Sequence, residues 1–174
     1  MSKNNQTSVT TTFAGIGTFV IDDLASILHC VPSSLYRLRQ RYFATGRMPY
    51  LWRIALSLLA DESIKNWHII SIVDVPIMTV NSKLGLSAEQ FGCLLGKDKA
   101  VISRWGNQKR ISETLSPATK LVLQSLFVEH QVTLPIMLSV MSEHGTIPQK
   151  QRLLFFRNVL LGEPVTKASA TSVP

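Results

Sequence analysis

The stretch that decides the fold is LSAEQFGCLLGKDKAVISRWGNQKR, residues 86–110. Its apolar residues recur at spacings of three and four, which predicts two short helices interrupted at Gly96. Ser87 and Gln90 have the spacing of a capping box that opens the first helix. Asp98 is placed to cap the second helix. The stretch therefore predicts two helices joined by a tight turn.

The same pattern occurs earlier in the chain, at an offset of 67 residues and without a gap. The small residue Ala25 falls on Gly92, where the second helix of such a motif crosses the first closely. The apolar anchor of the second helix is Leu35 in one copy and Ile102 in the other. In the earlier copy Val31 stands at the capping position, where its side chain cannot accept a hydrogen bond. With one inserted residue the similarity continues into a third helix, through the pairs Pro49 and Pro117, Ser57 and Ser125, and Leu58 and Leu126. Self-similarity at a fixed offset predicts one supersecondary unit used twice.

Residues 86–110 resemble the Cro and phage-repressor helix-turn-helix family in the small residue, the Leu-Gly turn and the Ser-Arg-Trp ending at Trp105. They depart from it at Lys97, usually apolar, and at Gly106, often Glu. IDDLASILHCVPSSLYRLRQ, residues 21–40, resembles the same superfamily. The two-motif arrangement also resembles TraN-type regulators of conjugative plasmid transfer, which imitate a Cro-like dimer within one polypeptide. The resemblance implies a mainly α fold in which two tandem helix-turn-helix units form a pseudo-dimer.

Six segments make up the expected organisation. They are a disordered arm (1–12), the first unit (13–66), a connecting segment (67–85), the second unit (86–131), closing helices (132–162) and a disordered tail (163–174). The connecting segment begins with WHIISIVDV, residues 67–75, whose β-branched residues favour a short central strand. Periodicity alone leaves a buried helix open for the same residues.

The chain has 174 residues and a formal net charge of +7. Hydrophobic residues make up 45% of it and charged residues 17%, which excludes a disordered chain. Residues 24–60 contain five arginines and no acid, and residues 97–110 contain five basic residues against Asp98 alone. Such clustering is expected of a surface that meets phosphates, although a solvated helix face is the plainer alternative.

In this family the recognition helix enters the major groove with its N-terminal residues at base edges. The resemblance therefore assigns base reading to Pro32, Ser33, Ser34, Tyr36 and Arg37 in the first unit, and to Lys99, Ala100, Val101, Ser103 and Arg104 in the second. Arg37 and Arg104 would each contact guanine through both guanidinium nitrogens, and Ala100 and Val101 would meet a thymine methyl group. For Tyr36 and Val101 the alternative is packing against the core. Phosphate contacts are expected from Arg39, Arg41, Arg47, Lys97, Lys109 and Arg110.

The sequence offers no catalytic constellation. Its four histidines and two cysteines lack the spacing of metal ligands, and it has no glycine-rich phosphate loop. No apolar run has the length of a membrane-spanning helix, and the N-terminus lacks the apolar run of a signal peptide. We therefore expect a cytoplasmic protein that is not an enzyme and needs no cofactor or metal.

The expected partner is double-stranded DNA, with no membrane involved. The chain would be a sequence-specific transcriptional regulator, a repressor more readily than an activator, acting on genes of plasmid or mobile-element transfer. It would read an imperfect palindrome as a monomer with internal pseudo-two-fold symmetry, with higher oligomers left open. The alternative is an antitoxin-like or nucleoprotein accessory protein that binds a partner through the apolar helix at residues 148–161.

Overall fold

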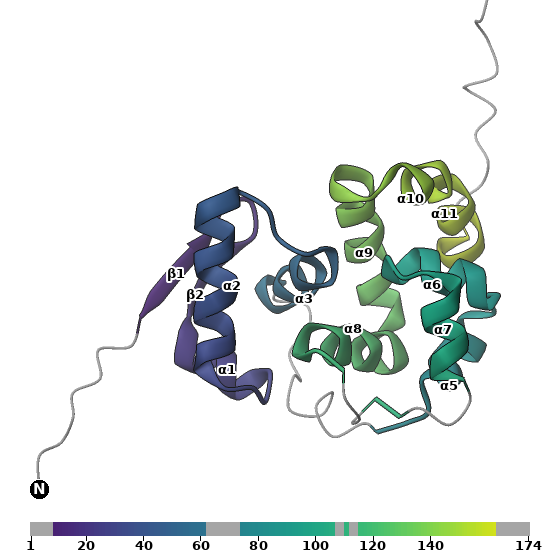
Figure 1. Ribbon diagram of the computed structural model, residues 1–174. Coiled ribbons are helices and arrows are strands. Elements are labelled where there is room, and N and C mark those ends of the chain that lie inside the picture. The colour runs from purple at the N-terminus through teal and green to yellow at the C-terminus, as the bar shows by residue number, and fades with distance from the viewer. Residues whose placement is uncertain (1–8, 62–73, 107–109, 112–114, 163–174) are drawn as a thin grey trace, which may run out of the picture.

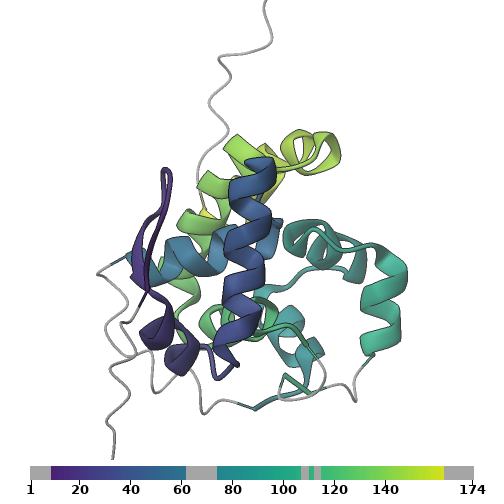
Figure 2. The ribbon, with the colours of Figure 1, turned by 60° about the vertical axis from the view of Figure 1, so that its left-hand side comes forward.

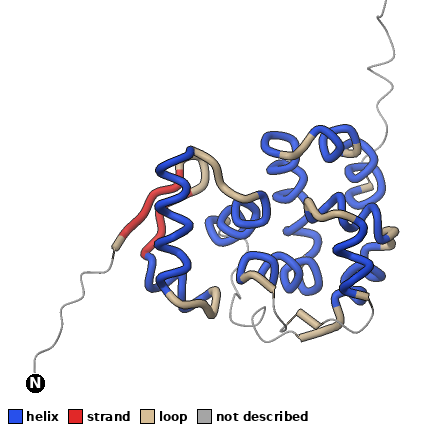
Figure 3. The backbone as a smooth tube through the Cα atoms, viewed as in Figure 1, coloured by secondary structure: helices blue, strands red, loops and turns tan. Residues whose placement is uncertain are grey.

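The computed structural model describes residues 9–61, 74–106, 110–111 and 115–162. These residues form ten helices and one two-stranded antiparallel sheet, which confirms a mainly α fold. Within the part of the chain described, the strands are confined to an N-terminal hairpin (Figure 3). Most of the expected central strand, residues 67–73, lies outside the described residues.

The hairpin consists of β1 (Thr10–Phe13) and β2 (Gly17–Val20). The prediction of a disordered arm through residue 12 is therefore wrong for the last three of its residues. Alternation along β1 buries Thr11 and Phe13 on one face, and Gly15 supplies the left-handed backbone of the turn, with φ +72°. Burial of the phenyl ring of Phe13 places this strand against the core.

Two helix pairs follow, each leading to a further helix. The first set is α1 (Ile21–Ile27), α2 (Pro32–Thr45) and α3 (Tyr50–Ala60). The second set is α5 (Ile77–Leu84), α6 (Ala88–Leu95), α7 (Lys99–Trp105) and α8 (Pro117–Val128). The helices α1 and α6 begin 67 residues apart, and so do α2 and α7, as the repeat predicts. The N-terminal cap residues of these helices show the same offset.

The turn inside each pair has the same backbone hydrogen bonding. The Cys30 N–H donates to the carbonyl of Ala25 over 3.0 Å, and the matched bond runs from Lys97 to Gly92 over 2.8 Å. The repeated apolar positions are buried in both copies: Leu24 and Phe91, Leu28 and Leu95, Leu35 and Ile102. Equivalent sequence positions thus produce equivalent local structure.

The helices α3 and α8 pack directly against each other at the centre of the molecule. In Figure 1 they lie side by side, with the α1/α2 pair on the left and the α6/α7 pair on the right. In this view α2 rises and α7 descends, and the turned view of Figure 2 agrees. The two pairs therefore flank a shared centre in opposite orientations.

The C-terminal helices cover that centre on one side. The long helix α9 (His130–His144) packs on both α3 and α8. It is followed by α10 (Ile147–Gln151) and α11 (Leu153–Leu161), and α11 lies along α9. One buried cluster of apolar residues extends through both halves of the chain.

Candidate nucleic-acid interface

The outer face of α2 carries most of the residues assigned to the first unit. Pro32, Ser33 and Arg37 are exposed, and Arg41 lies one turn beyond Arg37 on the same face. Arg41 and Arg37, with Arg47 just past the helix, form no ion pair with any described residue. This helix therefore presents uncompensated positive charge to solvent.

Two other residues of α2 are partly withdrawn from solvent. Ser34 and Tyr36 are half-buried, and the Tyr36 ring packs at the edge of the core. The Tyr36 side chain thus has the packing contact that the sequence left as its alternative.

Arg39, expected at a phosphate, has partners within the protein. Its Nε donates to Thr11 Oγ1 over 2.7 Å, and its guanidinium carbon lies 5.2 Å from the centre of the Phe43 ring. The Tyr42 hydroxyl accepts a hydrogen bond from the Ala14 N–H over 3.2 Å. These contacts attach the N-terminal hairpin to α2, so Arg39 positions the helix in this structure.

The outer face of α7 carries the residues assigned to the second unit. Its exposed side chains are those of Lys99, Ala100, Ser103 and Arg104, whereas Val101 is half-buried. The Nε of Arg104 donates to the Ala100 carbonyl over 3.3 Å, which leaves its terminal nitrogens facing solvent. The two sets of assigned residues thus lie on separate helices on opposite sides of the molecule (Figure 1).

The remaining basic residues near α7 differ in their surroundings. Lys97 is half-buried in the turn before the helix. Arg110 pairs with Asp74, Nε to Oδ2 over 2.9 Å, and also donates to the Asp74 carbonyl. Lys109 lies outside the described residues. The positive charge of the second unit is therefore partly compensated, in contrast to that of α2.

Capping differs between the helices of the second pair. Ser87 and Gln90 form the expected capping box: the Ser87 N–H donates to Gln90 Oε1 over 2.8 Å, and the Gln90 N–H donates to Ser87 Oγ over 3.2 Å. The prediction that Asp98 caps α7 is wrong, because its side chain makes no cap hydrogen bond. Asp98 is exposed and acts as the backbone cap alone.

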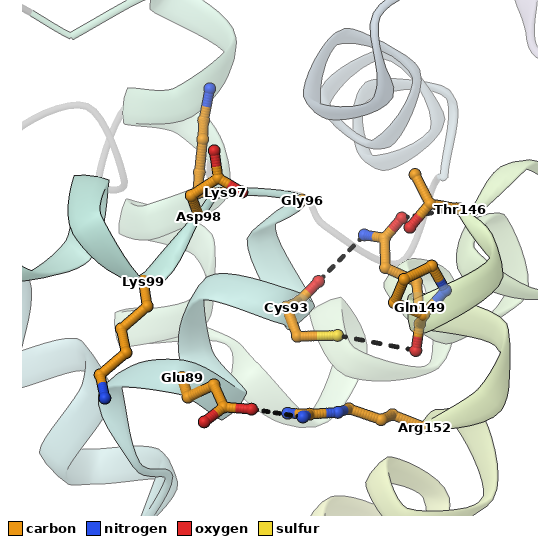
Figure 4. A pocket seen from close by; sticks show the side chains of 10 residues that line it. Glu89, Cys93, Gly96, Lys97, Asp98, Lys99, Thr146, Gln149 and Arg152 are labelled. Atoms are coloured by element: carbon orange, nitrogen blue, oxygen red, sulfur yellow. Dashed lines mark hydrogen bonds and ion pairs between the residues drawn. The ribbon is translucent and has the colours of Figure 1, made fainter.

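A brace from the C-terminal helices holds the α6/α7 pair (Figure 4). The buried Gln149 donates from Nε2 to the Cys93 carbonyl over 3.0 Å, and Arg152 pairs with Glu89. A pocket of about 310 Å³ lies between this brace and the start of α7. The Arg152 guanidinium lowers the pKa of the Glu89 carboxyl, while burial raises the pKa of the Cys93 thiol. These groups attach α10 and the start of α11 to α6.

Tyr50 links the first half of the chain to the second. Its hydroxyl donates to the Leu94 carbonyl of α6 over 3.3 Å, and its ring lies against Gly96 in the second turn. Burial raises the pKa of Tyr50. The first residue of α3 therefore contributes to the position of α6 and of the turn that leads to α7.

Sequence reasoning missed two exposed apolar side chains on either side of the turn between α1 and α2, the front edge of the first unit. Val31, the residue before α2, is 63% exposed, and Ile27 at the end of α1 is 39% exposed. The matched residues of the second unit are the exposed Asp98 and the buried Leu94. The absence of a polar cap at Val31 was the signal in the sequence that could have identified this edge.

Neither a metal cluster nor a membrane span emerges from the described residues. They contain no group of three or more His, Cys, Asp or Glu side chains that could hold a metal ion. None of their helices has both the length and the apolar character to cross a bilayer. Comparison with known proteins found no matching family model, curated protein or solved structure.

Proposed function

We propose that this chain is a sequence-specific double-stranded DNA-binding protein with two helix-turn-helix units. The observation that carries the proposal is the repeated helix pair, in which the second helix of each copy is exposed and bears basic and small polar residues. In α2 these are Ser33, Arg37 and Arg41, and in α7 they are Lys99 and Arg104. Such helices enter the major groove, where arginine reads guanine and backbone contacts come from the remaining cations.

The relation between the two pairs supports reading of a palindrome by one chain. The matched helices α3 and α8 pack together, and α2 and α7 point in opposite directions on either side of them (Figure 1). A two-fold axis through the α3/α8 contact would account for that arrangement. The two helices would then enter successive major grooves about 34 Å apart. Because α2 and α7 differ in sequence, the half-sites would differ too.

Repression follows most simply from such binding, since occupancy of a promoter excludes polymerase without further contacts. The genes regulated would be those of plasmid or mobile-element transfer. The protein would act in the cytoplasm as a monomer, without cofactor or enzymatic activity.

Selection of bound sites from a random DNA pool tests this function. We expect one enriched sequence with two unequal half-sites, bound by one protein per duplex, with affinity that falls steeply as salt rises. Equal binding to random DNA, or protection of a single half-site, would contradict the proposal.

Paired arginine variants test the assignment of the helices. Arg37→Ala and Arg104→Ala should each relax specificity in one half-site only, at a cost of about 1–3 kcal/mol in binding free energy. The matched control is Arg157→Ala on α11, a cation outside both pairs, which should leave specificity unchanged. Loss of specificity in both half-sites from either single variant would refute separate reading.

A second candidate function rests on the outer face of α11. Leu154, Phe155 and Val159 are 56%, 37% and 51% exposed, which is unusual for large apolar residues on one short helix. An antitoxin-like or accessory protein would bind a partner there. In that case Val159→Asp would abolish partner binding, whereas DNA binding would stay as in the unmodified chain.

A further inference from the structure

The front edge of the first unit breaks a local rule of helix construction. The residue before a helix is most often Ser, Thr, Asp or Asn, whose oxygen accepts a hydrogen bond from the first turn. Here it is Val31, which makes no such bond and leaves 63% of its surface in solvent. Ile27, at the other side of the same turn, is 39% exposed. The edge therefore gives up a cap and exposes apolar surface at once.

The second unit shows that this backbone does not demand an exposed apolar edge. At the matched positions it has the exposed, polar Asp98, whose side chain also makes no cap hydrogen bond, and Leu94, which is fully buried and whose carbonyl accepts a hydrogen bond from the Tyr50 hydroxyl. The backbone hydrogen bond that starts each helix is the same, from Ser34 to Val31 over 3.0 Å and from Val101 to Asp98 over 2.9 Å. A polar residue thus fits this backbone. Local rules are broken most often where a surface has another task.

We infer that Val31, supported by Ile27, is a specificity-determining residue that contacts thymine C5-methyl groups in the half-site read by α2. The inference rests on the proposed function, because it needs α2 in the major groove. There the N-terminal end of the helix meets base edges, and the thymine methyl is the one apolar group that a base pair offers. Pro32, exposed beside Val31, extends the same apolar edge. The half-site under α2 would therefore contain thymine where this edge makes contact.

Replacement of thymine by deoxyuridine provides the test, because it removes only the methyl group. The probe is the duplex selected from the random pool, and the α2 half-site is the one whose specificity Arg37→Ala relaxes. With the unmodified protein, deoxyuridine in this half-site should weaken binding about fourfold for each contacted methyl, the value of one buried carbon.

Val31→Ser separates this role from a structural one. The serine hydroxyl can cap α2, so the unfolding midpoint should rise by about 2–4 °C. Binding to the thymine duplex should nevertheless weaken about fourfold, and the effect of deoxyuridine in the α2 half-site should disappear. Deoxyuridine in the other half-site should act on Val31→Ser as it does on the unmodified protein. Ile147→Ser, at an apolar residue of α10 that is 74% exposed, is the control and should keep full sensitivity.

Each other outcome overturns the inference. A selected α2 half-site without thymine, or an unmodified protein indifferent to deoxyuridine there, would overturn it and leave the proposed function intact. So would a Val31→Ser variant as sensitive as the unmodified protein. A pool that yields no preferred sequence would overturn both the inference and the proposed function.

Discussion

The α1/α2 pair and the α6/α7 pair share a turn but differ in what surrounds it. The helix α2 has 14 residues, whereas α7 has seven and stops at Gly106, whose φ of +51° ends the helical path. The α6/α7 pair is braced by α10 through Gln149, whereas the main contacts of α1 are with α2 and β2. The comparison teaches that the buried positions fix the backbone of the repeat, while the exposed positions are free to diverge.

The element before each pair shows the same principle in a stronger form. The first unit has the hairpin where the second has α5, although the two segments occupy matched positions in the sequence. Phe13 of β1 and Val80 of α5 stand 67 residues apart and are both buried. A strand and a helix thus each bury one apolar side chain at matched sequence positions. The secondary structure differs between the two segments, whereas burial at this position is the same.

The largest expected effect comes from the matched anchors of the second helices. Leu35→Ala and Ile102→Ala should each lower the free energy of unfolding by about 2–5 kcal/mol, because both side chains are fully buried. Both variants should unfold in one urea transition, since a single core connects the two units. The exposed Ser33→Ala should change little. Two separate transitions in either core variant would show that the units fold independently.

Substitutions at the residue where the two helices of each pair cross should have smaller effects on stability, and these effects should differ between the two units. A Cβ on Gly92 would lie 2.7 Å from the Lys97 carbonyl oxygen and 3.1 Å from Ile102 Cγ1, so Gly92→Ala should cost about 1–2 kcal/mol despite the higher helix propensity of alanine. The first crossing already accommodates Ala25, and Ala25→Gly should cost about 1 kcal/mol through propensity alone. Chemical denaturation measures both. If Gly92→Ala raised the free energy of unfolding, the α6/α7 crossing would have as much room for a methyl group as the α1/α2 crossing.

Substitutions of the matched turn residues should change the stability of the protein in opposite directions in the two units. His29 has φ +48°, a left-handed conformation that costs a non-glycine residue about 1–2 kcal/mol. His29→Gly should therefore raise stability by about 0.5–1 kcal/mol after the entropy cost of glycine is subtracted. At the matched position, Gly96→Ala should lower stability, because φ is +62° and Tyr50 Cδ1 lies 2.9 Å from the new Cβ. Thermal unfolding of both variants checks the signs, and equal signs would contradict the shared turn.

The smallest expected effect concerns the exposed pair of Glu89 and Arg152. The pKa of Glu89 is lowered in the folded protein, so its contribution to stability is present above the ordinary glutamate range and is lost as the pH falls through the folded-state pKa. Glu89→Gln should remove that contribution, so it should lower stability slightly near neutral pH and leave stability at low pH almost unchanged. Asp22, at the matched position on α1, pairs with no described cation, so Asp22→Asn is the control. Unfolding midpoints measured from pH 3 to 7 should show a pH dependence that only Glu89→Gln reduces.

The sequence predicted the parts of the fold that local residue patterns determine, and it did not predict the parts that depend on long-range packing. The helix pairs and the 67-residue offset were predictable, because residues such as Leu35 and Ile102 repeat at fixed spacing and must both be buried. The hairpin was also within reach, since TTTF and GTFV flank a short glycine-containing turn, but the polar run before it favoured a disordered arm. The contact between α3 and α8 could not be predicted, because periodicity indicates which face of a helix is apolar and does not indicate which helix covers that face.

The candidate interface also has features that the sequence predicts and features that depend on long-range contacts. Exposure of Arg37 and Arg104 follows from their places on amphipathic helices. The engagement of Arg39 with Thr11 depends on a hairpin 28 residues away, and the pairing of Arg110 with Asp74 joins residues 36 apart. Such long-range partners have no signature in charge composition. Assignments of phosphate contacts from clustered basic residues therefore count some cations that the fold has already used.

The packing of α3 on α8 has a consequence for how the protein responds to its own abundance. In a dimeric regulator the two reading helices separate on dilution, so occupancy depends on the square of the protein concentration when the subunits are mostly apart. Here the equivalent contact is internal to one chain, and its effective concentration is set by the polypeptide and not by the number of molecules present. The two halves remain together in a solution of any dilution, so the proposed binding of DNA by one chain would be governed by one binding equilibrium.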